Sequence, residues 1–243
     1  MRPSFPRAAI LAAALLAAAP AVHAQTADEI VAKNIEAKGG VATLKATTSV
    51  RASGKGTMQG AEISFTASTK RPYSFRNEMD MAGQKMIRAF DGETLWMAVG
   101  TTPPQALPPG PQTETLKQLS QIDSPLLDYK EKGTKIALGE PLAEDGRKLH
   151  HLVVTPKAGP ALHFYIDPTT YLEARMVIVD VEDAGRPMKM ELRFSDYKTI
   201  EGRTIPLTIT QFVNGNQVNV LKYEKIEFNV PLEDSIFRMP KQG

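Results

Sequence analysis

The feature of this sequence that most constrains its fold is a hydrophobic pattern of period two that begins at Ser49. Apolar and polar residues alternate, for example, through Ile63-Ser-Phe65-Thr-Ala67 and Met188-Lys-Met190-Glu-Leu192. Successive side chains of a β-strand point to opposite faces, so this alternation predicts strands that bury one face. We therefore expect a sheet to make up most of the chain after residue 49.

Short turn signals separate the alternating segments. Most place a glycine or a proline beside a small or polar residue, which is typical of hairpin turns. They are Gln59-Gly60, Ala82-Gly83, Asp91-Gly92, Asp145-Gly146, Gly159-Pro160, Asp167-Pro168, Gly185-Arg-Pro187, Glu201-Gly202 and Asn214-Gly215-Asn216. Their spacing predicts a mainly β fold of about ten or eleven strands in one meandering antiparallel sheet. No repeat of about 20–50 residues is present, so the pattern does not favour a propeller or a solenoid.

A short helix is expected before the first strand. Thr26-Ala-Asp-Glu29 has the spacing of a capping box, which satisfies free N–H groups at a helix N-terminus. Ile30, Val31 and Ile35 follow at helical spacing, and Gly39-Gly40 marks the end of the helix. A helix this short is marginal in water, so its apolar stripe must pack against another part of the fold.

Residues 1–24 have the features of a signal peptide. Arg2 and Arg7 precede an apolar run, and small residues end the segment at Val22-His-Ala24. The run is shorter than the about 20 residues of a transmembrane helix; a retained membrane anchor is the alternative. We expect cleavage after Ala24 and a mature domain of residues 25–243. Because the chain has no cysteine, we expect neither a disulfide nor a lipidated N-terminus.

Charge and missing motifs argue against several functions. Without Arg2 and Arg7, 27 of the 29 basic residues remain, against 27 acidic ones. A balanced chain is poorly suited to bind nucleic acid through bulk charge. The sequence has no Gly-x-Ser-x-Gly nucleophile elbow, no phosphate-binding loop and no His-Glu-x-x-His zinc motif. We therefore expect no enzyme activity, no metal ion and no cofactor.

The histidines do not form a metal site in the expected sheet. His150 and His151 are neighbours in one strand and therefore point to opposite faces. If Lys157 to Pro160 forms the turn, His163 pairs near Val154, about 13 Å along the strand from His150. We expect all three histidines to be surface or edge residues.

One segment interrupts the alternating pattern. Gly100 to Gln112 contains five prolines, and proline cannot donate a hydrogen bond to a sheet. We therefore expect an exposed loop, followed by a short helical stretch with Leu116 and Leu119 on one side. A long loop and short helix inside a sheet form either a lid or a passive insertion.

Methionine is concentrated in the expected strands. Its flexible, polarizable side chain suits surfaces that accept varied apolar shapes, although any single methionine can equally fill a core. Its presence in several strands favours a shared, adaptable cavity. The strand methionines are Met58, Met79, Met81, Met86, Met97, Met176, Met188 and Met190.

Three segments carry a resemblance to a known family. They are Lys70-Arg71-Pro72-x-x-Phe75-x-x-x-Met79 with Asp91-Gly92-x-Thr94-Leu95-Trp96; Val153-Val-Thr-Pro-Lys157; and Leu232 to Pro240. Together they span most of the mature chain and resemble the LolA-type family of periplasmic lipoprotein carriers. One departure is Asn77, which stands where a member of that family has a tryptophan.

The resemblance implies an incomplete antiparallel β-barrel, a half-barrel, whose concave face is covered by short helices and holds acyl chains. It also implies a role for Arg71, because in the family this arginine hydrogen-bonds the covering loop or helix and keeps the empty carrier closed. The other residues of the expected ligand-binding site are selected because alternate residues of a strand share one face. These are Phe65, Phe75, Met79, Met81, Trp96, Met188 and Met190.

We therefore expect a periplasmic carrier that binds acyl chains of lipoproteins or lipids and delivers them toward the outer membrane without catalysis. Its partners would be an inner-membrane donor and an outer-membrane acceptor, and the carrier itself is expected to be a monomer. One alternative is a LolA-like sensor or scaffold protein in envelope homeostasis. Another is an envelope hydrolase, although the missing nucleophile elbow argues against it.

Overall fold

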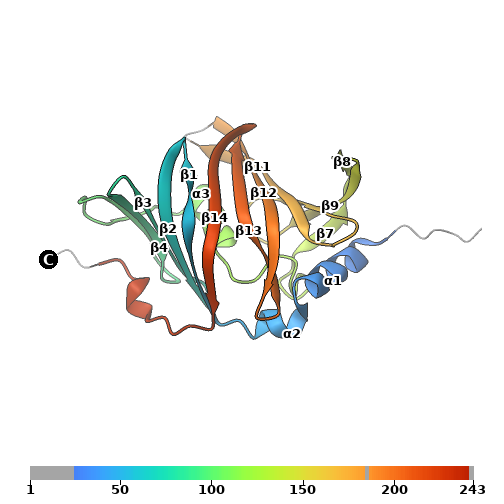
Figure 1. Cartoon of the computed structure of the whole chain (residues 1–243), viewed down its shortest axis with the longest axis horizontal. Helices are drawn as coiled ribbons and strands as arrows, with labels where there is room; N and C mark the ends of the chain where they lie inside the picture. The colour runs from blue at the N-terminus through green and yellow to red at the C-terminus, as the bar shows by residue number, and fades with distance from the viewer. Residues whose placement is uncertain (1–24, 184–185, 241–243) are drawn as a thin grey trace, which may run out of the picture.

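One curved sheet dominates the structure (Figure 1). The computed structural model describes residues 25–183 and 186–240; within them, fourteen strands form an antiparallel sheet in the order β6-β5-β4-β3-β2-β1-β14-β13-β12-β11-β10-β9-β7, and β8 pairs with β9. The strands are β1 (Ser49–Met58), β2 (Ala61–Lys70), β3 (Ser74–Met81), β4 (Gln84–Phe90), β5 (Leu95–Val99), β6 (Gln105–Ala106), β7 (Lys135–Leu138), β8 (Leu142–Glu144), β9 (Arg147–Thr155), β10 (Leu162–Ile166), β11 (Glu173–Asp183), β12 (Arg186–Ile200), β13 (Arg203–Val213) and β14 (Asn216–Phe228).

The predicted fold class is confirmed. The terminal strands β6 and β7 do not pair with each other, so the sheet is an open half-barrel. Its strand count is higher than expected because β6, β7 and β8 contain only two, four and three residues. Strands this short show no readable alternation in the sequence. The other eleven strands correspond to the predicted number.

Most of the predicted turns join neighbouring strands. In five of them both central residues have positive φ, for example Gln59 at 50° and Gly60 at 85°, which is the conformation of type I′ hairpin turns. These five are Gln59-Gly60, Ala82-Gly83, Asp145-Gly146, Glu201-Gly202 and Asn214-Gly215. Type I′ turns match the twist of the flanking strands and so fix the register of each hairpin. The predicted turn at Gly185 and the predicted signal peptide lie outside the described residues.

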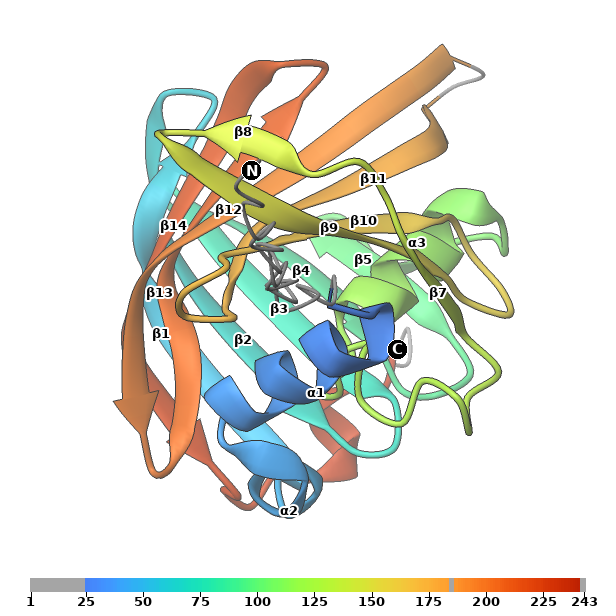
Figure 2. The same cartoon turned by 90° about the vertical axis from the view of Figure 1, so that its right-hand side faces the viewer.

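The helices are α1 (Ala27–Ala37), α2 (Gly40–Lys45), α3 (Pro111–Leu119) and the 3₁₀ turn η1 (Asp234–Ile236). Figure 2 shows α1 and α3 on the concave side of the curved sheet. Among the described residues, no helix combines the length and the apolar character needed to cross a membrane.

The predicted N-terminal helix is confirmed as α1. Thr26 Oγ1 accepts a hydrogen bond from Glu29 N at 3.2 Å, and Glu29 Oε2 accepts one from Thr26 N at 2.8 Å, which completes the capping box. The apolar stripe of α1 packs on strands β9 to β11. The resulting core contains Ile30, Val31, Ile35, Leu126, Leu127, Leu152, Val154, Leu162, Phe164, Ile166, Met176 and Ile178.

The proline-rich segment is less irregular than expected. Gln105 and Ala106 form the edge strand β6 against β5, and α3 begins at Pro111, inside the predicted loop. Leu107 and Leu116 pack on the buried cluster of Phe75, Phe90 and Leu95. Leu107 and Leu116 therefore cover the β3–β5 end of the concave face, while most of residues 100–109 are exposed, as predicted.

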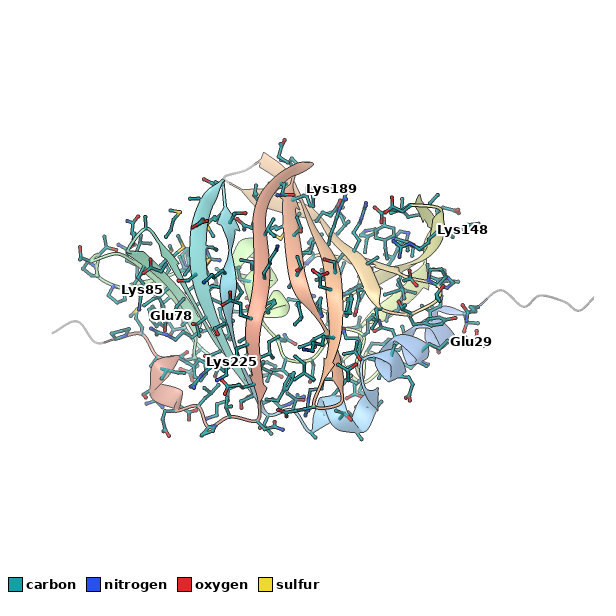
Figure 3. All side chains as sticks on the ribbon, viewed as in Figure 1. Glu29, Glu78, Lys85, Lys148, Lys189 and Lys225 are labelled. Carbon is teal, nitrogen blue, oxygen red and sulfur yellow. The ribbon has the colours of Figure 1, made fainter. Side chains whose placement is uncertain are left out.

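Charged side chains follow the outer, convex face of the sheet. Lys225 pairs with Glu227 at 2.9 Å on β14, and Lys85 of β4 lies 3.4 Å from Glu78 of β3. Figure 3 shows Glu78, Lys85 and Lys225 on the face turned to the viewer, away from α3. These charged pairs of the alternating pattern therefore face solvent.

Candidate functional site

A hollow lies on the concave face at the centre of the sheet. Its floor is formed by residues that pair across neighbouring strands. Val50 and Ala52 of β1 lie opposite Phe228 and Ile226 of β14. On the other side, they lie opposite Thr69 and Ala67 of β2. A cavity of about 320 Å³ lies between this floor and the chain segment 121–127. Its sheet-side lining also includes Ile205, Pro206, Ile209 and Tyr223.

Small residues follow one another on the inward face of β1. Gly54 and Gly56 follow Ala52 on the same face, so three successive inward positions carry little or no side chain. A Cβ atom at Gly54 would lie 2.0 Å from the backbone oxygen of Lys222, and one at Gly56 2.0 Å from that of Val220. Glycine therefore allows β14 to approach β1 closely where the register shifts beside Gly54.

The segment 121–127, which we call the cover, closes the hollow. Leu126 and Leu127 anchor its end in the core beside α1, where they are 1% and 2% exposed. A second cavity, of about 230 Å³, lies against the same cover residues and is bounded by Leu162, Phe164 and Met176. The cover thus lines two cavities, since residues 121–124 contribute to both.

Arg71 fastens the cover to the rest of the fold. Its Nη1 and Nη2 atoms donate to the two carboxylate oxygens of Asp123 in the cover, both at 2.6 Å. Nε donates to the carbonyl of Thr47 at 2.6 Å, and Nη2 also donates to the carbonyl of Leu44, at the end of α2, at 3.3 Å. The hydrogen bond to Asp123 is the main cause that raises the pKa of Arg71. One planar guanidinium therefore ties together the β2–β3 turn, α2 and the cover.

Arg203 is a second arginine at the hollow, and the sequence analysis missed it. Its Nε donates to Thr47 Oγ1 at 2.7 Å, Nη1 to the carbonyl of Glu201 at 2.8 Å, and Nη2 to the carbonyl of Thr43 at 3.4 Å. The guanidinium also lies 4.6 Å from the ring centre of Phe228. An arginine directly after the Glu201-Gly202 turn was the available signal. No signal in the sequence pointed to Asp123, the partner of Arg71, because Asp123 lies in an irregular segment 52 residues away.

The predicted lining residues other than Trp96 lie on the concave side of the sheet, but on either side of the cavity and not in it. Phe65 contacts Tyr223 edge-on at 5.2 Å between ring centres, and Phe75 packs beside Phe90. Met79 pairs with Phe65 and Met86, and Met81 follows on the same face. At the other flank, Met188 and Met190 pack against the core beneath α1. None of these residues lines the cavity of about 320 Å³.

Trp96 requires a correction. Its neighbour Leu95 pairs with Phe90 and shares the face of Phe75, whereas Trp96 pairs with Ala89 and points to the outer face. There it is 1% exposed, and its Nε1 donates to the carbonyl of Phe237 at 2.7 Å. The error arose because a shift of one residue in a strand exchanges the two faces. Trp96 holds the C-terminal segment against the back of the sheet.

We expect Trp96→Phe to destabilise the fold without changing ligand binding. The variant keeps an aromatic ring but leaves the buried carbonyl of Phe237 without its donor, which costs about 1–3 kcal/mol. Urea unfolding would measure this loss, and titration with a fatty acid would show an unchanged dissociation constant. A large loss of fatty-acid affinity in a folded variant would contradict the placement of Trp96 outside the hollow.

The register at the histidines differs by one residue from the expected one. His163 pairs with Val153, one residue from the predicted partner, and this register places His151 Nε2 2.9 Å from His163 Nδ1. His151 also stacks on Tyr165 at 4.6 Å between ring centres. The described residues contain no group of three or more His, Cys, Asp or Glu side chains that could hold a metal ion.

Comparisons with known proteins were made for the whole chain. No family model and no curated protein matches it. Among solved structures, a DUF1329 family protein from Desulfovibrio piger superposes with a TM-score of 0.58 at 13% identity, covering 86% of this chain and 95% of that one. A LolA superfamily protein from Nitrosomonas europaea gives a TM-score of 0.57 at 17% identity, covering 88% and 98%.

A domain from Vibrio parahaemolyticus, named for outer membrane lipoprotein sorting, gives a TM-score of 0.54 at 10% identity, covering 86% of this chain and 95% of that one. The architecture is thus that of an open half-barrel with a covered concave face. The chain has a LolA-like fold, as its sequence motifs predicted. At these identities the likeness is one of fold.

Proposed function

We propose that this protein is a carrier that binds acyl chains of lipids or lipoproteins in its concave hollow. The observation that carries the proposal is the apolar cavity of about 320 Å³ beneath the cover. This volume lies at the lower end of the usual range for ligand sites, about 300–1,000 Å³. A long chain would need more room, which the second cavity supplies when the cover moves.

Cargo and the closed cover compete in this proposal. Each buried CH₂ group contributes about 0.8 kcal/mol, so a long acyl chain supplies enough free energy to displace the cover. Opening breaks the bonds between Arg71 and Asp123, and their recovery on closing favours release. The bonds therefore act as a latch that shifts the balance between an empty closed state and a loaded open state.

Methionines at the two flanks fit the same role. Met79 and Met81 on one side, and Met188 and Met190 on the other, are partly buried on the concave side. Their flexible side chains can repack around acyl chains of different length when the cover opens. A soft lining of this kind would hold cargo without the tight fit that prevents release.

We place the carrier in the periplasm. The predicted signal peptide at residues 1–24 supports export, and neighbours of the same fold include a domain named for outer membrane lipoprotein sorting. A donor in the inner membrane and an acceptor in the outer membrane follow from that role. Both partners are part of the proposal.

The direct test is whether fatty material accompanies the purified protein. Exported protein would be isolated without detergent, analysed by native mass spectrometry, and extracted for lipid analysis. We expect a bound species that extraction releases and that contains acyl chains. A protein that binds a polypeptide partner tightly and never carries lipid would instead support the sensor or scaffold alternative. Esterase and glycosidase activity would support the hydrolase alternative.

A further inference from the structure

An unpaired arginine lies on the concave side of the sheet. Arg88 of β4 lies opposite Asn77 of β3, which lies opposite Ala67, a lining residue of the cavity. Its Nε is buried and has no hydrogen-bond partner, the side chain as a whole is partly exposed, and among the described residues it forms no ion pair. A partly buried charge that no protein group satisfies, and that a ligand can still reach, points to a ligand.

The other cations near the hollow have partners. Arg71 is neutralised by Asp123, and Lys38 pairs with Glu173 at 2.6 Å. Lys117 of α3 pairs with Glu114 at 2.9 Å, and Arg203 donates to three neutral oxygens. Burial alone, with no nearby carboxylate, lowers the pKa of Arg88. The concave side therefore carries positive charge that its own acids do not balance, although the mature chain as a whole is balanced.

Arg88 lies within reach of a ligand in the cavity. Ala67, Asn77 and Arg88 lie opposite one another on the neighbouring strands β2, β3 and β4. At the usual strand spacing, the backbones of Ala67 and Arg88 are therefore about 10 Å apart. Methionines lie beside it: Met97 is directly opposite on β5, and Met86 is two residues earlier on β4. An alkyl chain in the cavity would therefore bring its headgroup past Asn77 to Arg88, beside these methionines.

We propose that Arg88 binds the anionic headgroup, a phosphate or carboxylate, of an amphiphile whose alkyl chain lies in the concave hollow. A guanidinium presents several coplanar donors that match both oxyanions, and the amide of Asn77 supplies a further donor opposite it. This inference rests on the proposed carrier function and specifies its ligand class. It predicts a preference for anionic lipids over neutral ones of equal chain length.

The test compares headgroups on one alkyl chain. Dodecyl phosphate, neutral 1-dodecylglycerol and inorganic phosphate would each be titrated calorimetrically into delipidated protein. We expect dodecyl phosphate to bind about tenfold more tightly than dodecylglycerol, and inorganic phosphate to bind at least about a hundredfold more weakly than dodecyl phosphate. In Arg88→Met, the two amphiphiles should bind within about twofold of each other, with dodecylglycerol affinity unchanged.

Two further variants keep the test decisive. Arg51→Met removes an exposed arginine from the outer face of β1 and should retain the full preference. Arg88→Gln retains a polar side chain and should lose the preference like Arg88→Met. Because Arg88→Met also removes an unpaired, partly buried charge, its thermal midpoint should rise by about 2–4 °C. A fall in that midpoint would indicate a structural role and overturn the inference.

The possible failures are distinguishable. If neither amphiphile binds the wild-type protein, the proposed carrier function is wrong, and this inference falls with it. If both bind equally, or if both Arg88 variants retain the preference, the carrier function stands and the role of Arg88 is wrong. If inorganic phosphate binds as tightly as dodecyl phosphate, the site recognises a free anion, which also overturns the inference.

Discussion

Replacing Arg71 with leucine is expected to preserve cargo binding, with an affinity no weaker than that of the wild type, and to slow cargo release by about tenfold. Arg71 donates to both carboxylate oxygens of Asp123, and these bonds exist only while the cover is closed. Bonds to charged groups contribute about 1.5–3 kcal/mol, a value that partial exposure of this pair reduces. Loss of about 1.4 kcal/mol from the closed state corresponds to a tenfold change in the equilibrium.

Asp123→Asn provides the matched change at the other end of the latch. It should produce the same defect, and the double variant should add little to either single change because both remove one interaction. Lys45→Met is the control. Lys45 pairs with Asp128 at 2.7 Å, but Lys45 is 48% exposed, and a pair this exposed contributes little.

Transfer to acceptor vesicles would measure the effect of the latch. Each variant would be loaded with a fluorescent fatty acid and mixed with vesicles, and the rate of transfer would be followed. Slow transfer by Arg71→Leu and Asp123→Asn, with normal transfer by Lys45→Met, is the expected pattern. Normal release by Arg71→Leu would show that these bonds do not control delivery.

Filling the hollow is expected to abolish acyl-chain binding. Ala67 lies on its floor, opposite Ala52 of β1, and Ala67→Phe would place an aromatic ring in the cavity of about 320 Å³. Affinity for a fatty acid should fall by at least about tenfold, because the chain loses several buried CH₂ groups at about 0.8 kcal/mol each. The cavity accommodates the ring, so the cost in stability should stay within about 1–3 kcal/mol.

Thr66→Phe is the matched control for this variant. Thr66 precedes Ala67 on β2 and therefore points to the opposite face, where it lies between Ser53 and Glu78. Fatty-acid titration should give wild-type affinity for Thr66→Phe, while thermal unfolding confirms that both proteins fold. A folded Ala67→Phe protein with undiminished affinity would mean that acyl chains bind elsewhere.

Local features of the fold were readable from the sequence. The capping box at Thr26 and Glu29 formed as predicted because it depends only on residues three apart. Glycine-containing turns such as Gln59-Gly60 and Asn214-Gly215 adopted positive φ because few other residues tolerate it. Alternation along long strands predicted the sheet, whereas β6 to β8 were too short to reveal it.

The candidate site was only partly readable. Parity placed Phe65, Phe75 and the methionines on the concave side, but Trp96 falls on the other face because β5 pairs Leu95 with Phe90. A register one residue from the predicted one likewise brings His151 and His163 together. The sequence motif identified Arg71 as a bridging residue, and the structure provides its partner in the cover.

The sequence by itself determined a meandering antiparallel sheet, its hairpin turns and its N-terminal helix, because periodicity, glycine and capping act over a few residues. The tertiary structure decided which face each ring occupies, which carboxylate meets Arg71, and that Arg88 meets none. These features depend on the curvature of the sheet and on segments brought together from distant parts of the chain, for which no local pattern exists.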